Sequence, residues 1–388
     1  MRIAILHQAV TNSNAPDESD VIVQTKAVGD ALTALGHTWE SFPCTLNLNS
    51  IRSWVEAFRP DIIFNIVESL EGTGRLIHLV PTLIDAMGFG YTGSCAEAIM
   101  VTSHKVIAKK HLLSLGLPTP SWVGPFPPDL SSTPVFAPAK ADPSARWIIK
   151  SVWEHASIGL DEKAVVLYNH TDCVNDLLSK CASQYGGACF AETFIDGREF
   201  NLSILAGPNG PEVLKPAEIL FEGYPPDWLR IVGYRAKWES SSYEYQNTPR
   251  RYDFPVADDQ ILAKLQELSI QCWQGFGLKG YARVDFRVDS IGKPWILEIN
   301  TNPCLSPDAG FAAALHASGI SYTNAIERIL ADTRGREYPS QTFHKVKPDP
   351  AMLRPQNFQQ TRLPFLRHAV CFEDSPKVRG LVESTGFF

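Results

Sequence analysis

Strand and helix signals alternate over the first ninety residues, and this alternation limits the possible folds more than any other feature. Strand-like runs occur at 2–6, 38–42, 61–67 and 89–91. Helical patterns lie between them at 21–35, 51–58 and 76–87. Strands joined by helices pair side by side in a parallel sheet, with the helices on its faces. Residues 1–93 are therefore predicted to form a parallel α/β domain.

The rest of the chain predicts further domains of mixed α+β type. A chain of 388 residues has room for two or three domains. We expect a central domain at 94–195, a second α+β domain at 196–330 and a C-terminal extension at 331–388. Hydrophobic residues make up 44% and charged residues 20%, which is typical of a globular protein. The net charge of −7 argues against a nucleic-acid partner.

The lengths of the apolar runs and the spacing of the cysteines indicate the cellular compartment of the protein. No apolar run approaches the roughly 18 residues that span a bilayer. The first residues, Met1 to His7, turn polar too soon for a secretory signal. The eight cysteines form no Cys-x-x-Cys pair, so reduced cysteines are favoured over a zinc site. We expect a cytoplasmic protein without a membrane partner.

Two short polar patterns near residue 290 predict a metal and anion site. Arg283-Val-Asp285 and Glu298-Ile-Asn300 each place two polar side chains on one face of a strand. A Gly292-containing turn between them predicts a hairpin that brings the four together. Two carboxylates and an amide carbonyl are oxygen ligands suited to Mg²⁺, and an arginine suits an oxyanion. The alternative is a charged, solvated strand face.

A second pattern predicts a nucleotide-binding hairpin. Asp196-Gly197 between the runs 189–195 and 198–205 has the sequence of a two-residue hairpin turn. Such a turn would place Phe194 opposite Glu199, with Glu192 on the same face. That face could hold a purine and its ribose hydroxyls. An ordinary amphipathic hairpin is the alternative.

Three further features involve lysines and a helix start. Lys150 ends a predicted strand before the small-residue loop 154–159 and could bind phosphates, although no Walker motif is present. Lys105 alone would be read as a solvated helix lysine. Ser306-Pro307 predicts a helix with Ser306 as its N-cap.

Together these segments resemble the ATP-grasp superfamily and, within it, the D-alanine–D-alanine ligase-like carboxylate–amine ligases. The resemblance covers residues 60–330 in order and spacing, and Arg-x-Asp followed by Glu-x-Asn-Thr-x-Pro is its most specific part. The segments that carry it are 89–94, 103–105, 116–120, 149–150, 192–199, 236–238, 280–285 and 297–303. The resemblance implies an ATP-grasp fold, in which two α+β domains enclose ATP beside an N-terminal α/β domain.

The resemblance also implies roles for individual residues. It assigns Arg283, Lys237 and Ser157 to catalysis. It assigns Asp285, Glu298 and Asn300 to two Mg²⁺ ions, which Mn²⁺ could replace. Residues implied to bind ATP are Lys105, Lys150, Glu154, Ser157, Glu192, Phe194, Ile195, Glu199, Lys237 and Leu297. Among these, Glu192 would lie at the adenine, Glu199 at the ribose, and Glu154 and Ser157 in a loop over the phosphates.

The departures from the family pattern cluster at the substrates. Ala156 and Trp238 replace a serine and a tyrosine that latch the loop in those ligases. Ala309 replaces a serine that binds the second substrate, and the nearby Asp308 opposes an anion there. Acidic residues at Glu18, Glu68 and Glu71 could hold an ammonium group or could be solvated loop acids. We therefore expect substrates other than a simple pair of D-alanines.

The expected activity is ATP-dependent formation of an amide or peptide bond between small carboxylate and amine substrates through an acyl phosphate, with release of ADP and phosphate. A homodimer is possible. Two alternatives are a non-catalytic ATP-binding scaffold and a ligase that modifies a peptide or protein end with the help of 331–388.

Overall fold

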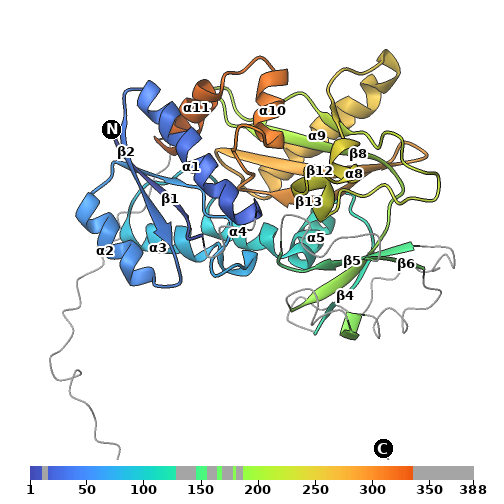
Figure 1. The fold of residues 1–388 in the computed structure, drawn as a ribbon, viewed down its shortest axis with the longest axis horizontal. Coiled ribbons are helices and arrows are strands. Elements are labelled where there is room, and N and C mark those ends of the chain that lie inside the picture. The colour runs from blue at the N-terminus through green and yellow to red at the C-terminus, as the bar shows by residue number, and fades with distance from the viewer. Residues whose placement is uncertain (11–15, 128–145, 155–163, 168–177, 181–186, 335–388) are drawn as a thin grey trace, which may run out of the picture. The chain divides into compact units, whose positions relative to one another are not determined.

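The computed structural model describes residues 1–10, 16–127, 146–154, 164–167, 178–180 and 187–334. Three sheets organise this part of the chain (Figure 1). The extension predicted at 331–388 falls almost entirely outside the described residues. No helix among the described residues is long and apolar enough to cross a membrane.

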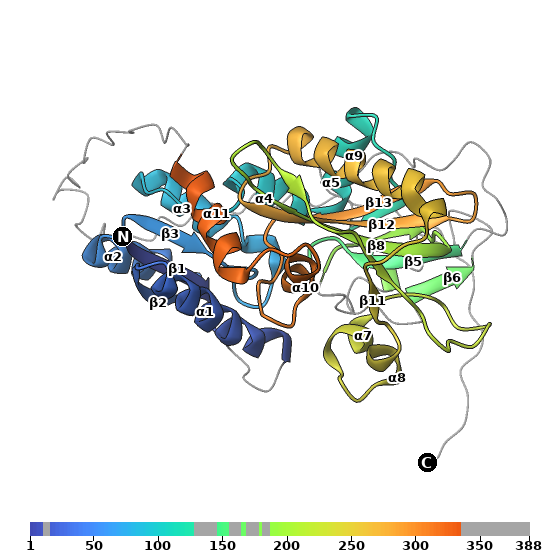
Figure 2. The same cartoon turned by 90° about the horizontal axis from the view of Figure 1, so that it is seen from above.

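The N-terminal sheet is parallel, as predicted. It has the order β2-β1-β3, from β1 (Arg2–Gln8), β2 (Thr38–Cys44) and β3 (Ile62–Asn65). Helices α1 (Pro16–Ala34), α2 (Leu48–Phe58) and α3 (Leu79–Met87) flank it, with a 3-10 turn at Gly74–Leu76 (Figures 1 and 2). The predicted fourth strand at 89–91 is wrong. Tyr91 makes a single bridge to Ile63 before the chain turns at Gly93, whose φ is 86°, so no ladder extends.

The second sheet is antiparallel and follows a helix pair. Helices α4 (Ala96–Ser103) and α5 (Lys105–Ser114) are separated at His104, whose ring accepts a hydrogen bond from the amide of Ile107 and so caps α5. Strands β4 (Trp122–Phe126), β5 (Arg146–Ser151), β6 (Val165–Leu167) and β7 (Cys189–Thr193) then form a sheet of order β4-β7-β5-β6. Its strands position Lys150 and Glu192.

The third sheet contains the strands that carry the predicted metal site. Its order is β11-β10-β8-β12-β13, with β9 beside β8. The strands are β8 (Gly197–Leu205), β9 (Glu212–Val213), β10 (Ala217–Ile219), β11 (Arg250–Arg251), β12 (Tyr281–Asp289) and β13 (Pro294–Asn300). The helices of this region are α7 (Tyr234–Trp238), α8 (Tyr243–Gln246), α9 (Asp259–Gly275), α10 (Gly310–Ala317) and α11 (Tyr322–Arg334), with a 3-10 turn at Val256–Asp258.

One face of the third sheet is apolar and the other is polar. Helix α9 packs against β8, β12 and β13 (Figure 2). Leu202, Val284 and Ile299 point into the core beneath this helix and are almost fully buried. Side chains alternate between the faces of a strand, so the neighbouring polar residues point the opposite way. This packing fixes which side chains can form a site.

The predicted hairpin at Asp196-Gly197 is wrong. Strand β7 belongs to the second sheet and β8 to the third, so the two do not pair. Gly197 instead lies opposite Asp289 on β12 with a φ of 152°, and a Cβ there would be 2.0 Å from the carbonyl oxygen of Val288. The glycine therefore permits a close backbone approach where the chain passes from the second sheet to the third. Glycine is also typical of tight turns, so the local sequence is the same in both cases.

Candidate active site

Three rows of polar side chains cross the polar face of the third sheet. On β12, Arg283, Asp285 and Arg287 alternate with buried apolar residues. The register places Arg283 opposite Asn300, Asp285 opposite Glu298, and Arg287 opposite Glu199. The hairpin of β12 and β13 is confirmed, and it brings the four residues of the predicted metal and anion site together. Directly opposed side chains lie about 5 Å apart at Cβ, which is close enough to share a ligand.

Arg283 and Asp285 form a two-pronged ion pair. Arg283 donates from Nε to Asp285 Oδ1 at 2.7 Å and from Nη2 to Oδ2 at 2.8 Å. Asn201 donates to the same Oδ1 at 2.9 Å. The side chain of Asn300 accepts from the amide of Asn302 at 3.0 Å. The donor set therefore holds two carboxylates and an amide in fixed positions, a chemistry that fits a hard divalent cation.

Burial changes the acidity of these groups. It raises the pKa of Asp285, with the negative charge of Glu298 adding to the effect and Arg283 opposing it. Burial lowers the pKa of Lys237, with Arg283 adding to the effect and Glu298 opposing it. A bound cation would offset the repulsion between the two carboxylates. The described residues contain no group of three or more His, Cys, Asp or Glu side chains that could hold a metal.

A cavity of about 630 Å³ lies over this sheet face. It is lined by residues of all three sheets, since its lining includes Gln8, Lys150 and Asp285. Most of the residues predicted to bind ATP, metal or substrate line it: Lys105, Lys150, Glu154, Glu192, Phe194, Ile195, Glu199, Lys237, Leu297, Arg283, Asp285, Glu298, Asn300, Glu68, Trp238, Asp308 and Ala309. The fold therefore gathers residues that are up to 241 positions apart in the sequence into one site.

Lys105 lies at the centre of this site and is buried, not solvated. Its Nζ donates to the carbonyl oxygen of Glu154 at 2.6 Å and lies 3.9 Å from Glu298 Oε2. The carboxylate of Glu154 accepts hydrogen bonds from the Thr73 hydroxyl at 2.9 Å and the Gly74 amide at 3.4 Å. Glu154 thus joins the segment after β5 to the turn at Gly74–Leu76 at the edge of the cavity.

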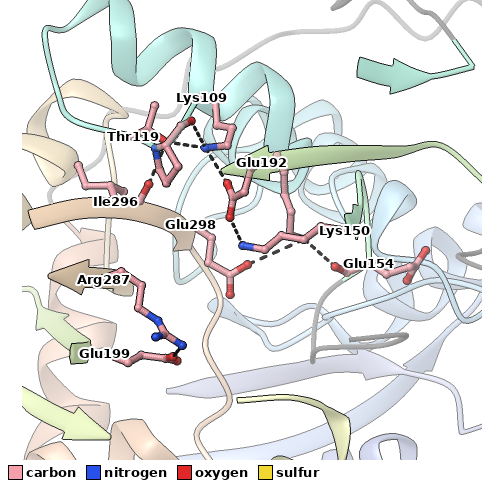
Figure 3. Close-up of polar contacts among 11 residues, drawn as sticks. Lys109, Thr119, Lys150, Glu154, Glu192, Glu199, Arg287, Ile296 and Glu298 are labelled. Carbon is pink, nitrogen blue, oxygen red and sulfur yellow. Dashed lines mark hydrogen bonds and ion pairs between the residues drawn. The ribbon is translucent and has the colours of Figure 1, made fainter. Parts of the chain in front are cut away.

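Glu192 is held between two lysines. Its carboxylate pairs with Lys150 and lies 2.8 Å from Nζ of Lys109 (Figure 3). Lys109 also donates to the Thr119 hydroxyl at 2.7 Å and the Pro120 carbonyl at 2.9 Å. Burial opposes ionisation of Glu192, but the two lysines outweigh it and lower the pKa of the carboxyl. The sequence predicted Glu192 and Lys150 but missed their third partner.

Two acidic side chains from the N-terminal part of the chain, Asp20 and Glu68, also line the cavity. Burial raises the pKa of Glu68 to about 7, although hydrogen bonding from Gln24 at 3.1 Å opposes the effect. Asp20 also raises the pKa of Glu68, and Arg283 lowers it. Asp20 accepts from the Cys304 thiol at 2.9 Å and from the Ser306 hydroxyl at 2.8 Å.

Several predicted residues are not brought into this cavity or cannot be placed. Glu71 does not line it, because a left-handed backbone with φ of 51° carries the side chain outwards, where it accepts from the Leu46 amide at 3.4 Å. Ser157 and the side chain of Glu18 lie outside the described residues. Ser306 is not a helix N-cap, since α10 begins later, with Ala309 at the N-cap, and the Ser306 hydroxyl binds Asp20.

Asn201 and Arg287 are cavity residues that the sequence patterns did not single out. Each extends a predicted pattern by one step of two residues, Glu199-x-Asn201 and Asp285-x-Arg287. The strand period could therefore have found both. Lys109 follows Lys105 by one helical turn, a spacing that by itself carries no information on burial.

Comparisons with known proteins identify the class of this fold and site, the ATP-dependent ligases with an ATP-grasp fold. The family model described as "D-ala D-ala ligase C-terminus" matches residues 112–331. Curated relatives include D-alanine–D-alanine ligases of Synechococcus (27% identical over 80% of this chain and 87% of the relative) and Marinomonas (31% identical over 69% and 76%).

Solved structures show the same fold. The D-alanine–D-alanine ligase of Bacillus anthracis in complex with ATP aligns with a TM-score of 0.62 and 20% identity, over 86% of this chain and 97% of that one. The ligase of Coxiella burnetii aligns with a TM-score of 0.59 and 16% identity, over 86% and 95%. The chain belongs to the D-Ala–D-Ala ligase C-terminus family, and its class is ATP-dependent carboxylate–amine ligase.

Proposed function

We propose that this protein joins a small carboxylate to a small amine through an acyl phosphate. The observation that carries the proposal is the convergence of Arg283, Asp285, Glu298 and Asn300 on one sheet face under a cavity that also contains Lys105 and Lys150. Such a site can bind a triphosphate, a divalent cation and a developing oxyanion at once. It matches the requirements of phosphoryl transfer followed by acyl transfer.

In the first step, a carboxylate oxygen of the first substrate attacks the γ-phosphorus of ATP. The bond between that phosphorus and the β–γ bridging oxygen breaks, and ADP leaves. Lys105, Lys150 and Lys237 line the cavity where they can contact the phosphates. Asp285, Glu298 and Asn300 would hold two Mg²⁺ ions, which when bound offset the negative charge of the phosphates.

In the second step, the amine nitrogen of the second substrate attacks the acyl carbon. Phosphate leaves and the nitrogen loses a proton, which gives an amide. Arg283 is positioned to donate to the carbonyl oxygen as it becomes negative, since its guanidinium is already directed along the sheet face by Asp285. Enclosure of the site would protect the acyl phosphate from water.

The substrates are proposed to differ from a pair of D-alanines. Glu68 and Asp20 both line the cavity, and their carboxyl groups can hold an ammonium group on the first substrate. At the N-terminus of α10, Ala309 offers no hydroxyl, and Asp308 disfavours a second carboxylate. These features favour an amino acid as the first substrate and an amine other than D-alanine as the second.

The test is ATP turnover with Mg²⁺ against amino acids and other small carboxylates, singly and in pairs. We expect ADP and phosphate to form only with particular pairs, with a product lighter than the pair by one water. Release of AMP would exclude the acyl phosphate route. D-alanine alone serves as the comparison, and its efficient dimerisation would overturn the proposed change of substrate. No turnover with any pair, in a protein that still binds ATP, would favour a scaffold.

A further inference from the structure

Arg287 is a buried cation in the wall of the cavity, and neither the metal site nor the phosphate-binding lysines account for it. It continues the row of Arg283 and Asp285 along β12, and only 4% of its surface is exposed. An arginine is rarely buried unless its guanidinium is fully paired. Its partners therefore indicate what this side chain does.

The guanidinium contacts residues from several separate segments of the chain. Nη2 lies 2.7 Å from Oε2 of Glu199, the residue directly opposite on β8 (Figure 3). Nη1 donates to the carbonyl oxygen of Gly197 at 3.2 Å, and Nη2 also donates to the carbonyl oxygen of Arg230. The rings of Phe194 and Phe221 each lie 5.7 Å from the guanidinium carbon, as centroid distances.

The contact with Arg287 fixes the orientation of the Glu199 side chain. A carboxylate paired with a buried, planar guanidinium keeps one orientation, because rotation would separate a pair that is shielded from water. Asp285 lies two residues from Arg287 on the same face of β12, about 7 Å along the strand. Glu199 therefore lies at a constant spacing from the metal and phosphate end of the cavity.

We propose that Arg287 is a positioning residue for the nucleotide sugar: it holds the carboxylate of Glu199 where it accepts hydrogen bonds from the ribose hydroxyls. This inference rests on the proposed function, which puts ATP in this cavity, and on the role at the ribose that the family resemblance implies for Glu199; the role of Arg287 is the new element. A ribose offers two adjacent hydroxyl donors, and a carboxylate of fixed orientation distinguishes a sugar that has both from one that lacks either. Arg287 acts through Glu199 and not on the phosphates that react.

The experiment compares ATP with 2′-deoxy-ATP and 3′-deoxy-ATP on wild type, Arg287→Met, Glu199→Gln and the double variant. Affinity is measured by calorimetry with Mg²⁺, and KM and kcat in turnover assays. We expect Arg287→Met to weaken ATP binding about tenfold, while binding of at least one deoxy analogue changes less than about threefold. KM for ATP should rise with little change in kcat. The double variant should bind ATP no more weakly than Glu199→Gln alone.

Arg251→Met is the matched control. Arg251 also pairs with a glutamate on a neighbouring strand, Glu218, and lies over the ring of Phe254, but it does not line the cavity. It should leave the preference for ATP over the deoxy analogues unchanged. If Arg287→Met does not fold by circular dichroism, Arg287→Lys, which keeps the charge and loses the planar fork, should show a partial loss of the same preference.

Equal weakening of ATP and both deoxy analogues in the Arg287 variant would overturn the inference, as would unchanged ATP binding. These outcomes are separate from failure of the proposed function, because nucleotide binding is measured without turnover. A wild-type protein that binds ATP but forms no amide would leave this test intact. A wild-type protein that binds none of the three nucleotides would overturn both.

Discussion

Nζ of Lys109 lies 2.8 Å from Oε2 of Glu192, and each side chain is only 1% exposed. Lys150 pairs with the other carboxylate oxygen from the cavity side. The carboxylate thus has one partner in the core and one at the wall of the site. If Lys150 turns towards a phosphate, Lys109 still neutralises Glu192. We regard this arrangement as the reason why a buried acid can lie in a site for a polyanion.

The first prediction concerns Lys109→Met. The variant leaves Glu192 buried with one lysine fewer, and loss of one partner of a buried pair costs about 3–5 kcal/mol. We expect a decrease of that order in the free energy of unfolding, measured by urea denaturation. Lys110→Met, at the next and less buried position of α5, should change it by less than about 0.5 kcal/mol. Equal free energies of unfolding for the two variants would show that the Lys109–Glu192 ion pair does not stabilise the fold.

The second prediction concerns Glu298→Gln. The change removes one charge from the proposed metal-binding set and leaves the shape of the side chain intact. We expect kcat to fall at least about a hundredfold at saturating Mg²⁺, and Mg²⁺ binding in the presence of ADP to weaken at least about tenfold. Glu56→Gln, on the exposed face of α2, is the control and should retain full activity. Normal Mg²⁺ binding by Glu298→Gln would contradict the assignment.

The third prediction concerns Arg283→Lys. Lysine keeps the charge but cannot reproduce the two-pronged contact to Asp285, so the cation would no longer be held at one place on the sheet face. We expect kcat to fall about 10²- to 10³-fold, with a smaller change in KM for ATP. Steady-state kinetics test this, with Arg52→Lys on α2 as the control. A variant that lost only ATP affinity would indicate that Arg283 binds the nucleotide and does not stabilise the oxyanion.

Local patterns predicted the parts of the site that lie on regular elements. The alternation along β12 and β13 identified Arg283, Asp285, Glu298 and Asn300, because strand period and a short turn fix which side chains face each other. The motifs of the resemblance also placed Lys105 correctly at the cavity, where helix periodicity alone favoured a solvated residue. The strand periodicity and the family motifs therefore gave complementary information about the site.

The sequence could not show which segments pack together across the sheets. The sequence Asp196-Gly197 is compatible with a tight turn and also with a close backbone approach beside β12. Only the pairing of β8 with β12 distinguishes the two. Lys109 could not be distinguished from a surface lysine, since its partners Thr119 and Glu192 come from other elements. The removal of Glu71 from the cavity depends on one left-handed backbone residue.

The last prediction uses the raised pKa of Glu68. Its pKa in the folded protein is about 7, against an ordinary value of 4.5, chiefly because of burial. Between these values the unfolded chain has lost the proton while the folded protein keeps it. The folded state therefore becomes less stable as pH rises from about 4.5 to 7, and above pH 7 the cost of ionising the buried group is fully present.

Glu68→Gln has no proton to lose at this position. We therefore expect the stability of the variant relative to wild type to increase from pH 4 to pH 8, by about 1–3 kcal/mol, since one pKa unit corresponds to about 1.4 kcal/mol and partial exposure reduces the effect. Urea denaturation at several pH values measures it. The control is Glu71→Gln, an exposed position in the same loop, whose difference from wild type should stay within about 0.5 kcal/mol over this range. If the Glu68 difference is equally flat, the carboxyl is solvated and does not form the closed acidic end of the cavity on which binding of a substrate ammonium depends.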